Sequence, residues 1–367
     1  MKKLLIYTDY YKQPTGYGRI AKTVLPELKK HFQIGYMPQN TTVFDTEYEY
    51  VKDMQSFNPD IVLTIQNWEL ISKLDIPFCH VNWCCIENEP FPEQWRLLLT
   101  QVDKLIPMTE FCQLVFKKAI PFHSKIVEPI MPPVDTVFHE MSFTELSGMN
   151  NPYKDKKIIL CVAKNESRKN LHALIAAFGI INNTYPDKYH LQIIQLPVKL
   201  DNTHIPWNLD MIADQYGIGT SMTYNTSTQP LEDSILNYLY NVSSCVVLSS
   251  QSEGIGMPLL EAASVGTPCV AVGYSGAAEI ARKYGRVVED YTPFWDADGR
   301  KYAFVKPEHL AHGIIMACEM KVDKRPENNI DRLIEEIDST RKVDNKYGIN
   351  MYPILARQLS GDIYTRV

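Results

Sequence analysis

Two series of short apolar segments, each alternating with helix-like segments, are the feature that most restricts how this chain of 367 residues can fold. Apolar, β-branched runs between helices are typical of parallel sheets built from right-handed βαβ units. In the first half, the predicted strands span residues 4–8, 32–37, 60–66, 77–83 and 104–108, with a helix at 21–31. In the second half, they span residues 158–162, 191–196, 222–224, 245–248, 269–272 and 286–288, with helices at 170–182, 231–241 and 258–265. The pattern predicts an α/β protein with two Rossmann-like, doubly wound parallel-sheet domains.

A polar segment interrupts the alternation and divides the chain. It contains SGMNNPYKDKK, whose Gly, Pro, Asn and Lys residues are typical of a linker between domains. We therefore predict a first domain at residues 1–140, a linker at 141–157, a second domain at 158–342, and a C-terminal helix at 343–367 that packs back on the first domain. Ligands of open parallel sheets bind outside the carboxyl ends of the strands, so two facing domains would place a site in the cleft between them.

Charge and composition argue against several functions. The formal net charge of -6 argues against a general polyanion binder, so we expect no nucleic-acid partner. Only four apolar residues follow Lys3 before the chain turns polar, which is too few for a signal peptide. No segment reaches the roughly 18 apolar residues of a membrane helix, and we expect a cytoplasmic protein. The eight cysteines lie mostly in apolar runs and are expected to be buried and reduced.

The segment from residue 249 to 261 carries the strongest chemical signal. A predicted strand runs into a loop with Gly254 and Gly256, and Pro258 then stands where the first residue of a helix is favoured. Glycines let backbone N–H groups approach a ligand, and the helix N-terminus favours an anion such as a diphosphate. Glu253 and Glu261 could accept hydrogen bonds from hydroxyl groups on opposite sides of that anion. An ordinary helix start with no ligand is the alternative interpretation.

Two further segments could join this site. Lys164, Arg168 and Lys169 follow the first strand of the second domain, where they would meet the anion, although a solvated helix start is the alternative. Gly16 and Gly18 follow the first strand of the chain, but Ala21 stands where a dinucleotide fingerprint needs its third glycine. This favours a glycine loop at the edge of the cleft over a nicotinamide cofactor site.

Taken together, these motifs resemble those of the retaining nucleotide-sugar glycosyltransferases of family 4, which have the two-domain architecture called GT-B. The segment 253–280, EGIGMPLLEAASVGTPCVAVGYSGAAEI, resembles the E-x7-E block of that family with its following turn and G-x-x-E end. Three other segments are similar to the family's basic loop, its L-Y stretch and its linker signature: 160–178, 239–250 and 133–138, with Pro133 in place of a glycine.

The resemblance implies roles for individual residues. Glu253 would face hydroxyls of the donor sugar, Glu261 would bind the ribose, and Lys169 with Arg168 would contact the diphosphate as the catalytic cations. Lys164 stands where the family usually has arginine. The remaining donor-binding positions are Gly16, Gly18, Asn165, Gly254, Ile255, Gly256, Met257, Pro258 and Leu259. Ser275, Gly276 and Glu279 match the end of the block.

The acceptor side is less defined. His80 is either the histidine that many relatives carry after the fourth strand or a core histidine. Glu87 is either a cleft residue or a loop charge. Asp296 and Asp298 form an Asp-x-Asp pair, the metal motif of a different glycosyltransferase architecture, but their polar loop favours a solvated turn.

We therefore expect transfer of a sugar from a UDP- or GDP-sugar to an acceptor hydroxyl with retention, and no metal or other cofactor. A GT-B sugar-nucleotide epimerase and a non-catalytic GT-B binding module are the alternatives. The sequence does not distinguish between a glycan, a lipid and a protein as the acceptor. Peripheral membrane contact through residues 112–125 is conceivable but disfavoured, because that helix is short.

Overall fold

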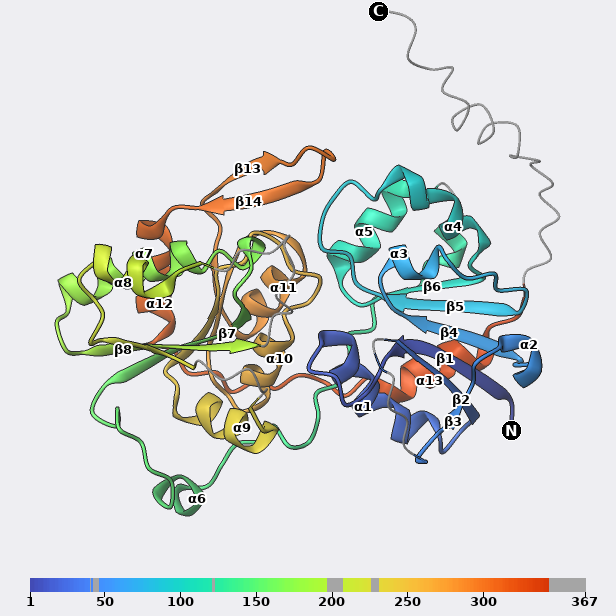
Figure 1. The fold of residues 1–367 in the computed structure, drawn as a ribbon, viewed down its shortest axis with the longest axis horizontal. Helices are drawn as coiled ribbons and strands as arrows, with labels where there is room; N and C mark the ends of the chain where they lie inside the picture. The colour runs from blue at the N-terminus through green and yellow to red at the C-terminus, as the bar shows by residue number, and fades with distance from the viewer. Residues whose placement is uncertain (40, 42–45, 121–122, 197–206, 226–230, 343–367) are drawn as a thin grey trace, which may run out of the picture.

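The computed structural model describes residues 1–39, 41, 46–120, 123–196, 207–225 and 231–342. Its first sheet has six parallel strands in the order β3-β2-β1-β4-β5-β6 (Figure 1). These strands are β1 (Lys3–Asp9), β2 (Gln33–Gln39), β3 (Glu49–Tyr50), β4 (Ile61–Ile65), β5 (Cys79–Cys84) and β6 (Lys104–Pro107). The order reverses between β1 and β4, which is the switch point where a doubly wound sheet binds ligands.

The second sheet repeats this topology. Its order is β12-β11-β10-β7-β8-β9, again with all pairs parallel. The strands are β7 (Lys157–Lys164), β8 (Tyr189–Leu196), β9 (Met222–Tyr224), β10 (Cys245–Leu248), β11 (Cys269–Val272) and β12 (Gly285–Val288). Its switch point lies between β7 and β10, so the loops that follow these two strands occupy the ligand-binding edge.

Helices cover both faces of each sheet because strand residues alternate between two cores. In β1, for example, Leu4 and Ile6 join one buried cluster and Leu5 joins another. Helices α1 (Gly16–Leu28) and α13 (Ile330–Ser339) pack on one face of the first sheet, and the other face carries α2 (Met54–Phe57), α3 (Trp68–Ile71), α4 (Arg96–Gln101) and α5 (Glu110–Ala119). On the second sheet, α9 (Asp233–Val242), α10 (Met257–Ser264) and α11 (Ser275–Tyr284) lie opposite α7 (Leu171–Thr184), α8 (Leu209–Gln215) and α12 (Pro307–Ala317).

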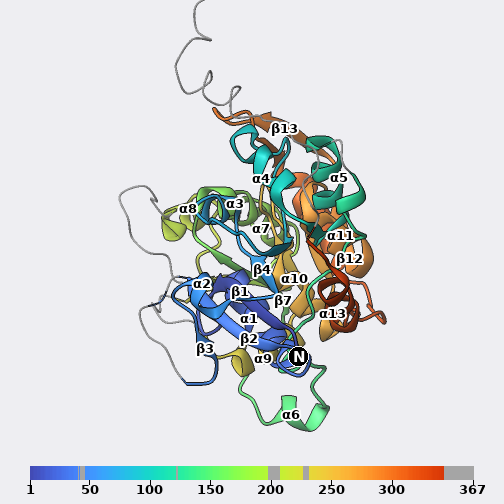
Figure 2. The ribbon, with the colours of Figure 1, turned by 90° about the vertical axis from the view of Figure 1, so that its right-hand side faces the viewer.

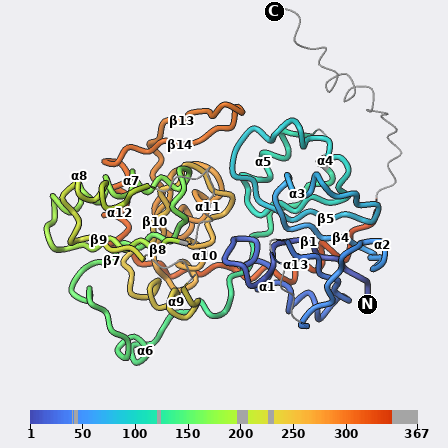
Figure 3. Tube along the Cα trace, in the orientation of Figure 1, coloured from blue at the N-terminus to red at the C-terminus, as the bar shows by residue number. Residues whose placement is uncertain are grey.

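The chain crosses between the domains twice, as Figure 3 shows. The first crossing contains the short helix α6 (Phe143–Ser147), and the second leads to α13. Although residues 330–339 fall within the range predicted for the second domain, α13 packs against the first, where Glu336 pairs with Lys104 at 2.7 Å. Asp338 of the same helix pairs with Lys2 at 2.8 Å. The predicted helix at 343–367 lies outside the described residues.

An antiparallel hairpin, β13 (Tyr291–Trp295) and β14 (Lys301–Val305), extends from the second domain. Figures 1 and 2 both show it beside the helices α4 and α5 of the first domain. Its Lys301 N–H donates to the Glu89 carbonyl at 2.8 Å, and its Lys301 carbonyl accepts from Asn88 at 2.7 Å. The hairpin therefore ties the two domains together at one end of the cleft.

The predicted fold class is confirmed, since both predicted sheets are present and doubly wound. The first helix differs from the prediction, because it begins at Gly16 and ends at Leu28 instead of spanning 21–31. Across the described part of the chain, none of the helices combines the length and the apolar character needed to span a membrane.

Candidate active site

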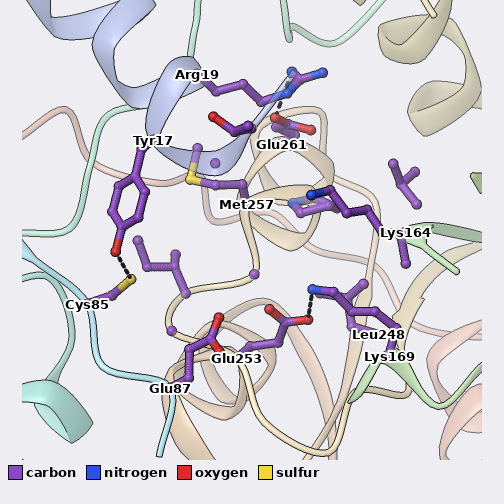
Figure 4. Close-up of a pocket in the computed structure, with 18 of the residues that line it drawn as sticks. Tyr17, Arg19, Cys85, Glu87, Lys164, Lys169, Leu248, Glu253, Met257 and Glu261 are labelled. Atoms are coloured by element: carbon purple, nitrogen blue, oxygen red, sulfur yellow. Dashed lines mark hydrogen bonds and ion pairs between the residues drawn. The ribbon is translucent and has the colours of Figure 1, made fainter. Parts of the chain in front are cut away.

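A pocket lies between the domains at the carboxyl ends of β1, β5, β7 and β10 (Figure 4). It encloses about 1080 Å³ of unfilled space, a volume that includes its open mouth. The first domain contributes residues 14–17, 19–20, 85 and 87 to the lining. The second domain contributes the loops after β7 and β10 and the first residues of α10.

The loop after β10 is shaped by a left-handed residue and by close backbone contacts. Gly256 has φ +88° and is the N-cap of α10, a conformation that side chains with a Cβ rarely adopt. The Glu253 N–H donates to Ser275 Oγ at 2.8 Å, and the Gly276 N–H donates to the Glu253 carbonyl at 2.9 Å. These contacts hold the loop against α11, so that the N-terminus of α10 faces the pocket.

Glu253 is the most strongly paired carboxylate of the pocket. Its Oε1 accepts from Lys169 Nζ and from Ser250 Oγ, each at 2.5 Å, and its Oε2 lies 3.3 Å from Arg168 Nη1. Burial alone would raise the pKa of Glu253, but the Lys169 and Arg168 charges outweigh it and lower the pKa to about 2. Glu253 is therefore ionised at neutral pH and accepts hydrogen bonds; it is not suited to act as a general acid.

Arg168 connects this carboxylate to the first domain. Its Nη1 donates to the Ser252 carbonyl at 2.6 Å, and its Nη2 lies 3.2 Å from Glu87 Oε1. Glu87 itself is 45% exposed on its side chain and lines the pocket. The structure thus places Glu87 in the cleft, which favours the first of the two interpretations of this residue.

Glu261 lies deeper in the pocket and is paired across the cleft. Its Oε1 accepts from Arg19 Nη1 at 3.0 Å, and its Oε2 accepts from the Tyr240 hydroxyl at 2.6 Å. Burial raises the pKa of Glu261, although the Arg19 charge opposes the shift. Arg19 also lies 3.1 Å from Asp233 through Nη2, so one guanidinium of the first domain holds two carboxylates of the second.

Most of the predicted site residues line this one pocket. They are Gly16, Glu87, Lys164, Arg168, Lys169, Glu253, Gly254, Ile255, Gly256, Met257, Pro258 and Glu261. Lys164 reaches into the pocket with its side chain 37% exposed and 3.9 Å from Glu166.

Three predicted donor-binding residues do not line the pocket. Asn165 is buried, and its side chain exchanges hydrogen bonds with the backbone of Trp207 at 2.9 and 3.0 Å. Leu259 is fully buried in the core. Gly18 serves packing, because a Cβ there would lie 2.9 Å from the Tyr10 carbonyl oxygen and still closer to that of Gln13. The predicted glycine loop is the first turn of α1, capped by Thr15.

His80 is a core histidine and lies away from the pocket. It stands near the amino end of β5, and the carboxyl end of a parallel strand is the one that faces the cleft. Its Nε2 lies 2.9 Å from Thr64 Oγ1, and burial lowers the pKa of His80 to about 3. The acceptor-side interpretation of His80 is therefore wrong.

The Asp-x-Asp pair belongs to the turn of the hairpin β13–β14. Arg300 Nε donates to Asp296 at 2.8 Å, and its Nη2 donates to Asp298 at 2.9 Å. Both carboxylates are thus paired with Arg300 within the turn, in agreement with the interpretation of this pair as part of a polar turn. In the described ranges, no cluster of three or more His, Cys, Asp or Glu side chains is placed to hold a metal ion.

Sequence reasoning gave no role to three residues of the first domain that form one wall of the pocket. Arg19 pairs with Glu261, and the Tyr17 hydroxyl lies 3.7 Å from Cys85 Sγ. The signal available for Arg19 was a cation directly after the two glycines that follow the first strand. Tyr17 and Cys85 carry no comparable signal, because their approach depends on tertiary structure.

Comparison with known proteins agrees with this architecture. Solved structures with similar folds include sucrose-phosphate synthase from Thermosynechococcus elongatus, with a TM-score of 0.62, 14% identity, and 98% of this chain and 99% of that chain covered. Anabaena HepE in complex with UDP and glucose gives a TM-score of 0.65 at 12% identity, with 98% and 100% covered. Trehalose 6-phosphate synthase from Burkholderia multivorans gives 0.64 at 12% identity, with 100% and 99% covered.

Two Rossmann-like domains facing each other across a pocket place the chain in the GT-B class of folds. A family model described as glycosyl transferases group 1 matches residues 142–329, which is more than half of the chain. The chain therefore belongs to the glycosyl transferases group 1. A comparison with curated protein sequences finds none that matches.

Proposed function

We propose that the chain is a retaining glycosyltransferase of the family-4 type, which moves a sugar from a nucleoside-diphosphate sugar to an acceptor hydroxyl without a metal ion. The observation that carries this proposal is the group formed by Glu253, Lys169 and Arg168 beside the N-terminus of α10. It combines an ionised acceptor for sugar hydroxyls with positive charge for a diphosphate, inside a pocket closed by the first domain.

The departing diphosphate needs stabilisation as the glycosidic bond breaks. The Lys169 ammonium has three N–H donors, and its bond to Glu253 uses one of them. The others, with the Arg168 guanidinium and the N-terminus of α10, would bind phosphate oxygens and stabilise the charge that develops on them. This positive charge takes the part that a metal ion plays in other transferases, which is why we propose a metal-independent reaction.

Glu253 would orient the donor sugar by accepting hydrogen bonds from its hydroxyls. Because two cations keep this carboxylate ionised, its acceptor capacity is constant across the neutral pH range. Precise placement of the sugar against the acceptor hydroxyl contributes to the rate by lowering the entropy cost of the transition state. Glu261 would accept hydrogen bonds from the ribose of the nucleotide.

The nucleotide of the donor is proposed to be UDP or GDP. Anabaena HepE has been solved with UDP and with UDP-glucose, which supports the uridine nucleotide. A thermal-shift screen against UDP- and GDP-sugars tests this, because a ligand that binds only the folded state raises Tm by mass action.

Substitution of the central residues tests the mechanism. Glu253→Gln and Lys169→Met preserve shape, and each should lower the rate of sugar transfer by about 100-fold or more, since each removes an electrostatic contact at the reacting centre. Lys157→Met is the matched control, because Lys157 starts strand β7, which leads into the loop of Lys169, but pairs with Glu319 outside the pocket. Near-normal turnover in both pocket variants, with circular dichroism unchanged, would reject the mechanism.

The two alternative functions are separated by incubating the protein with a nucleotide sugar and no acceptor. Formation of an epimerised free sugar would indicate a sugar-nucleotide epimerase. Slow release of nucleoside diphosphate is the result expected of a transferase. A protein that binds no nucleotide sugar in calorimetry would instead be a non-catalytic binding module. The paired state of Glu253 argues against that outcome, because a site without turnover gains nothing from burying three charges together.

A further inference from the structure

Glu261 depends on the first domain for its positive partner. The carboxylate belongs to α10 of the second domain, and its side chain is only 3% exposed. Arg19, which reaches it at 3.0 Å, belongs to α1 of the first domain. Figure 4 shows this pair at one end of the pocket, and both residues line it. In contrast, the cations that pair with Glu253 come from its own domain.

The groups that face Glu261 fall on three elements. From α9, the Tyr240 hydroxyl donates to its Oε2 at 2.6 Å, and the negative charge of Asp233 opposes its ionisation. From α1, Arg19 is the cation in contact with it. Lys22 of the same helix pairs with Asp233 at 2.6 Å and with Asp135, in the segment that precedes α6, at 3.1 Å. Burial is the largest influence on the pKa of Glu261 and raises it, and the Arg19 charge is the largest influence in the opposite direction.

An ionised Glu261 keeps free acceptor capacity. A carboxylate oxygen has two lone-pair sites, and the bonds from Arg19 and Tyr240 use one site on each oxygen. The remaining sites can accept from the two neighbouring hydroxyls of a ribose. A protonated carboxyl would instead offer an O–H donor and lose part of this capacity.

We propose that Arg19 is a positioning residue for nucleotide recognition: by pairing with Glu261 across the cleft, it holds this carboxylate in the orientation and the ionised form that accept the ribose hydroxyls. The inference rests on the proposed function, since it assigns the ribose of the donor to Glu261. It implies that the second domain alone is an incomplete nucleotide site, and that contact with the first domain completes it.

The test is isothermal titration calorimetry with UDP and with GDP from pH 5.5 to 8.5, on wild type, Arg19→Gln, Arg19→Lys and Lys22→Gln. Dividing the Kd of each variant by the wild-type Kd at the same pH removes the effect of the terminal phosphate of the nucleotide, which titrates near pH 6. We expect Arg19→Gln to weaken binding about 10-fold at pH 7, and the loss to grow by up to about 10-fold for each unit the pH is lowered. Arg19→Lys keeps the positive charge, so the ratio of its Kd to the wild-type Kd should not change with pH.

Lys22→Gln is the matched control. It removes a cation one turn further along α1 and breaks ion pairs that also join the domains, but it does not touch Glu261. The ratio of the Kd of Lys22→Gln to the wild-type Kd should therefore be independent of pH. A pH-dependent loss of the same size in Lys22→Gln would assign the effect to domain contact in general and overturn the inference.

Two further outcomes would contradict the proposal. If Arg19→Gln weakens nucleotide binding by the same factor at every pH, Arg19 contacts the nucleotide directly and does not act through the ionisation of Glu261. If Arg19→Gln binds the nucleotide more tightly than wild type, Arg19 competes with the nucleotide for Glu261. The variant Glu261→Gln cannot titrate, and adding Arg19→Gln to it should bring no new pH dependence; if it does, another group is responsible. If wild type binds neither UDP nor GDP, the proposed function itself fails, and this inference fails with it.

Discussion

At the scale of residues, the two glutamates of the pocket lie on one loop and helix and yet differ in their ionisation. Both are buried, which raises the pKa of a carboxyl group. Glu253 has two cations from its own domain, and its pKa falls to about 2. Glu261 has one cation, from the other domain, and its pKa stays raised. The distribution of positive partners, rather than burial, therefore separates the two carboxylates.

Glu253 should make the folded state sensitive to acid. Its pKa is about 2 when folded and 4.5 when unfolded, so its stabilising contribution is complete above pH 4.5 and is lost as the pH falls from 4.5 towards 2. Between pH 7 and pH 3 the loss should be on the order of 2 kcal/mol. The side chain of Glu253→Gln cannot titrate. Between pH 7 and pH 3, the free energy of unfolding of this variant should therefore fall by about 2 kcal/mol less than that of wild type, as urea unfolding at the two pH values would measure. Equal falls in the two proteins would contradict the assigned pKa.

The sequence could predict the residues of each domain that line the pocket, but not their pairing. Lys164, Arg168, Lys169 and Glu253 follow strands, and the carboxyl ends of parallel strands face the same edge. The pair of Arg19 and Glu261 joins positions 242 apart in the chain, and their contact depends on how the domains face each other. No local pattern encodes that orientation.

At the scale of elements, the first turn of α1 shows two glycines with different functions. Gly16 is open to the pocket, with no atom within 4 Å of the place a Cβ would take. Gly18 packs against the turn that precedes the helix, next to the carbonyl oxygens of Tyr10 and Gln13. One glycine therefore leaves room for a ligand, and the other lets the helix begin close to β1.

A pair of alanine substitutions tests this difference. Gly18→Ala would force backbone atoms apart, which should cost about 1–3 kcal/mol and lower Tm by about 3–10 °C. Gly16→Ala should leave Tm within about 2 °C, because the new methyl group meets no atom and alanine favours a helix. Differential scanning calorimetry measures both. A similar Tm for the two variants would show that the turn relaxes around Gly18.

The predicted strands agree with the structure where the strands are buried, and the exposed hairpin was missed for a physical reason. Runs such as Cys245–Leu248 are buried along their whole length, so every residue is apolar. In β14, Ala303 and Val305 are buried and their neighbours are not, and β13 contains Pro293, which weakens a strand prediction. The start of α1 was placed too late because its glycines have low helix propensity.

At the scale of the whole molecule, contacts between the two domains bridge the cleft both outside the pocket and at its lining. The Glu279 carboxylate of α11 accepts from the backbone N–H groups of Glu110 and Phe111 at 2.9 and 2.6 Å, and so caps the N-terminus of α5 in the first domain. Gly254 lies against Cys85, where a Cβ would come within 2.9 Å of the Cys85 Cβ. The closed arrangement is therefore stabilised by polar and packing contacts between the two domains themselves.

Removal of the cap should open the cleft. Glu279→Ala deletes two hydrogen bonds to a carboxylate, and we expect the closed arrangement to lose about 1–2 kcal/mol relative to an open one in which water solvates α5. Small-angle X-ray scattering should then give a larger radius of gyration, and saturating nucleotide should reverse part of the change. Glu289→Ala is the control, since this exposed carboxylate pairs with Arg282 of its own domain. The same radius in all three proteins would refute a role for the cap.

The return of α13 to the first domain has a consequence for synthesis. The first sheet leaves the ribosome long before Ile330–Ser339, and the whole second domain is made in between. Leu333 and Ile337, which are fully buried in the folded protein, cannot cover their part of the nascent sheet until the whole second domain has been synthesised. One face of the first sheet therefore stays partly uncovered during synthesis until a helix encoded after the second domain is available.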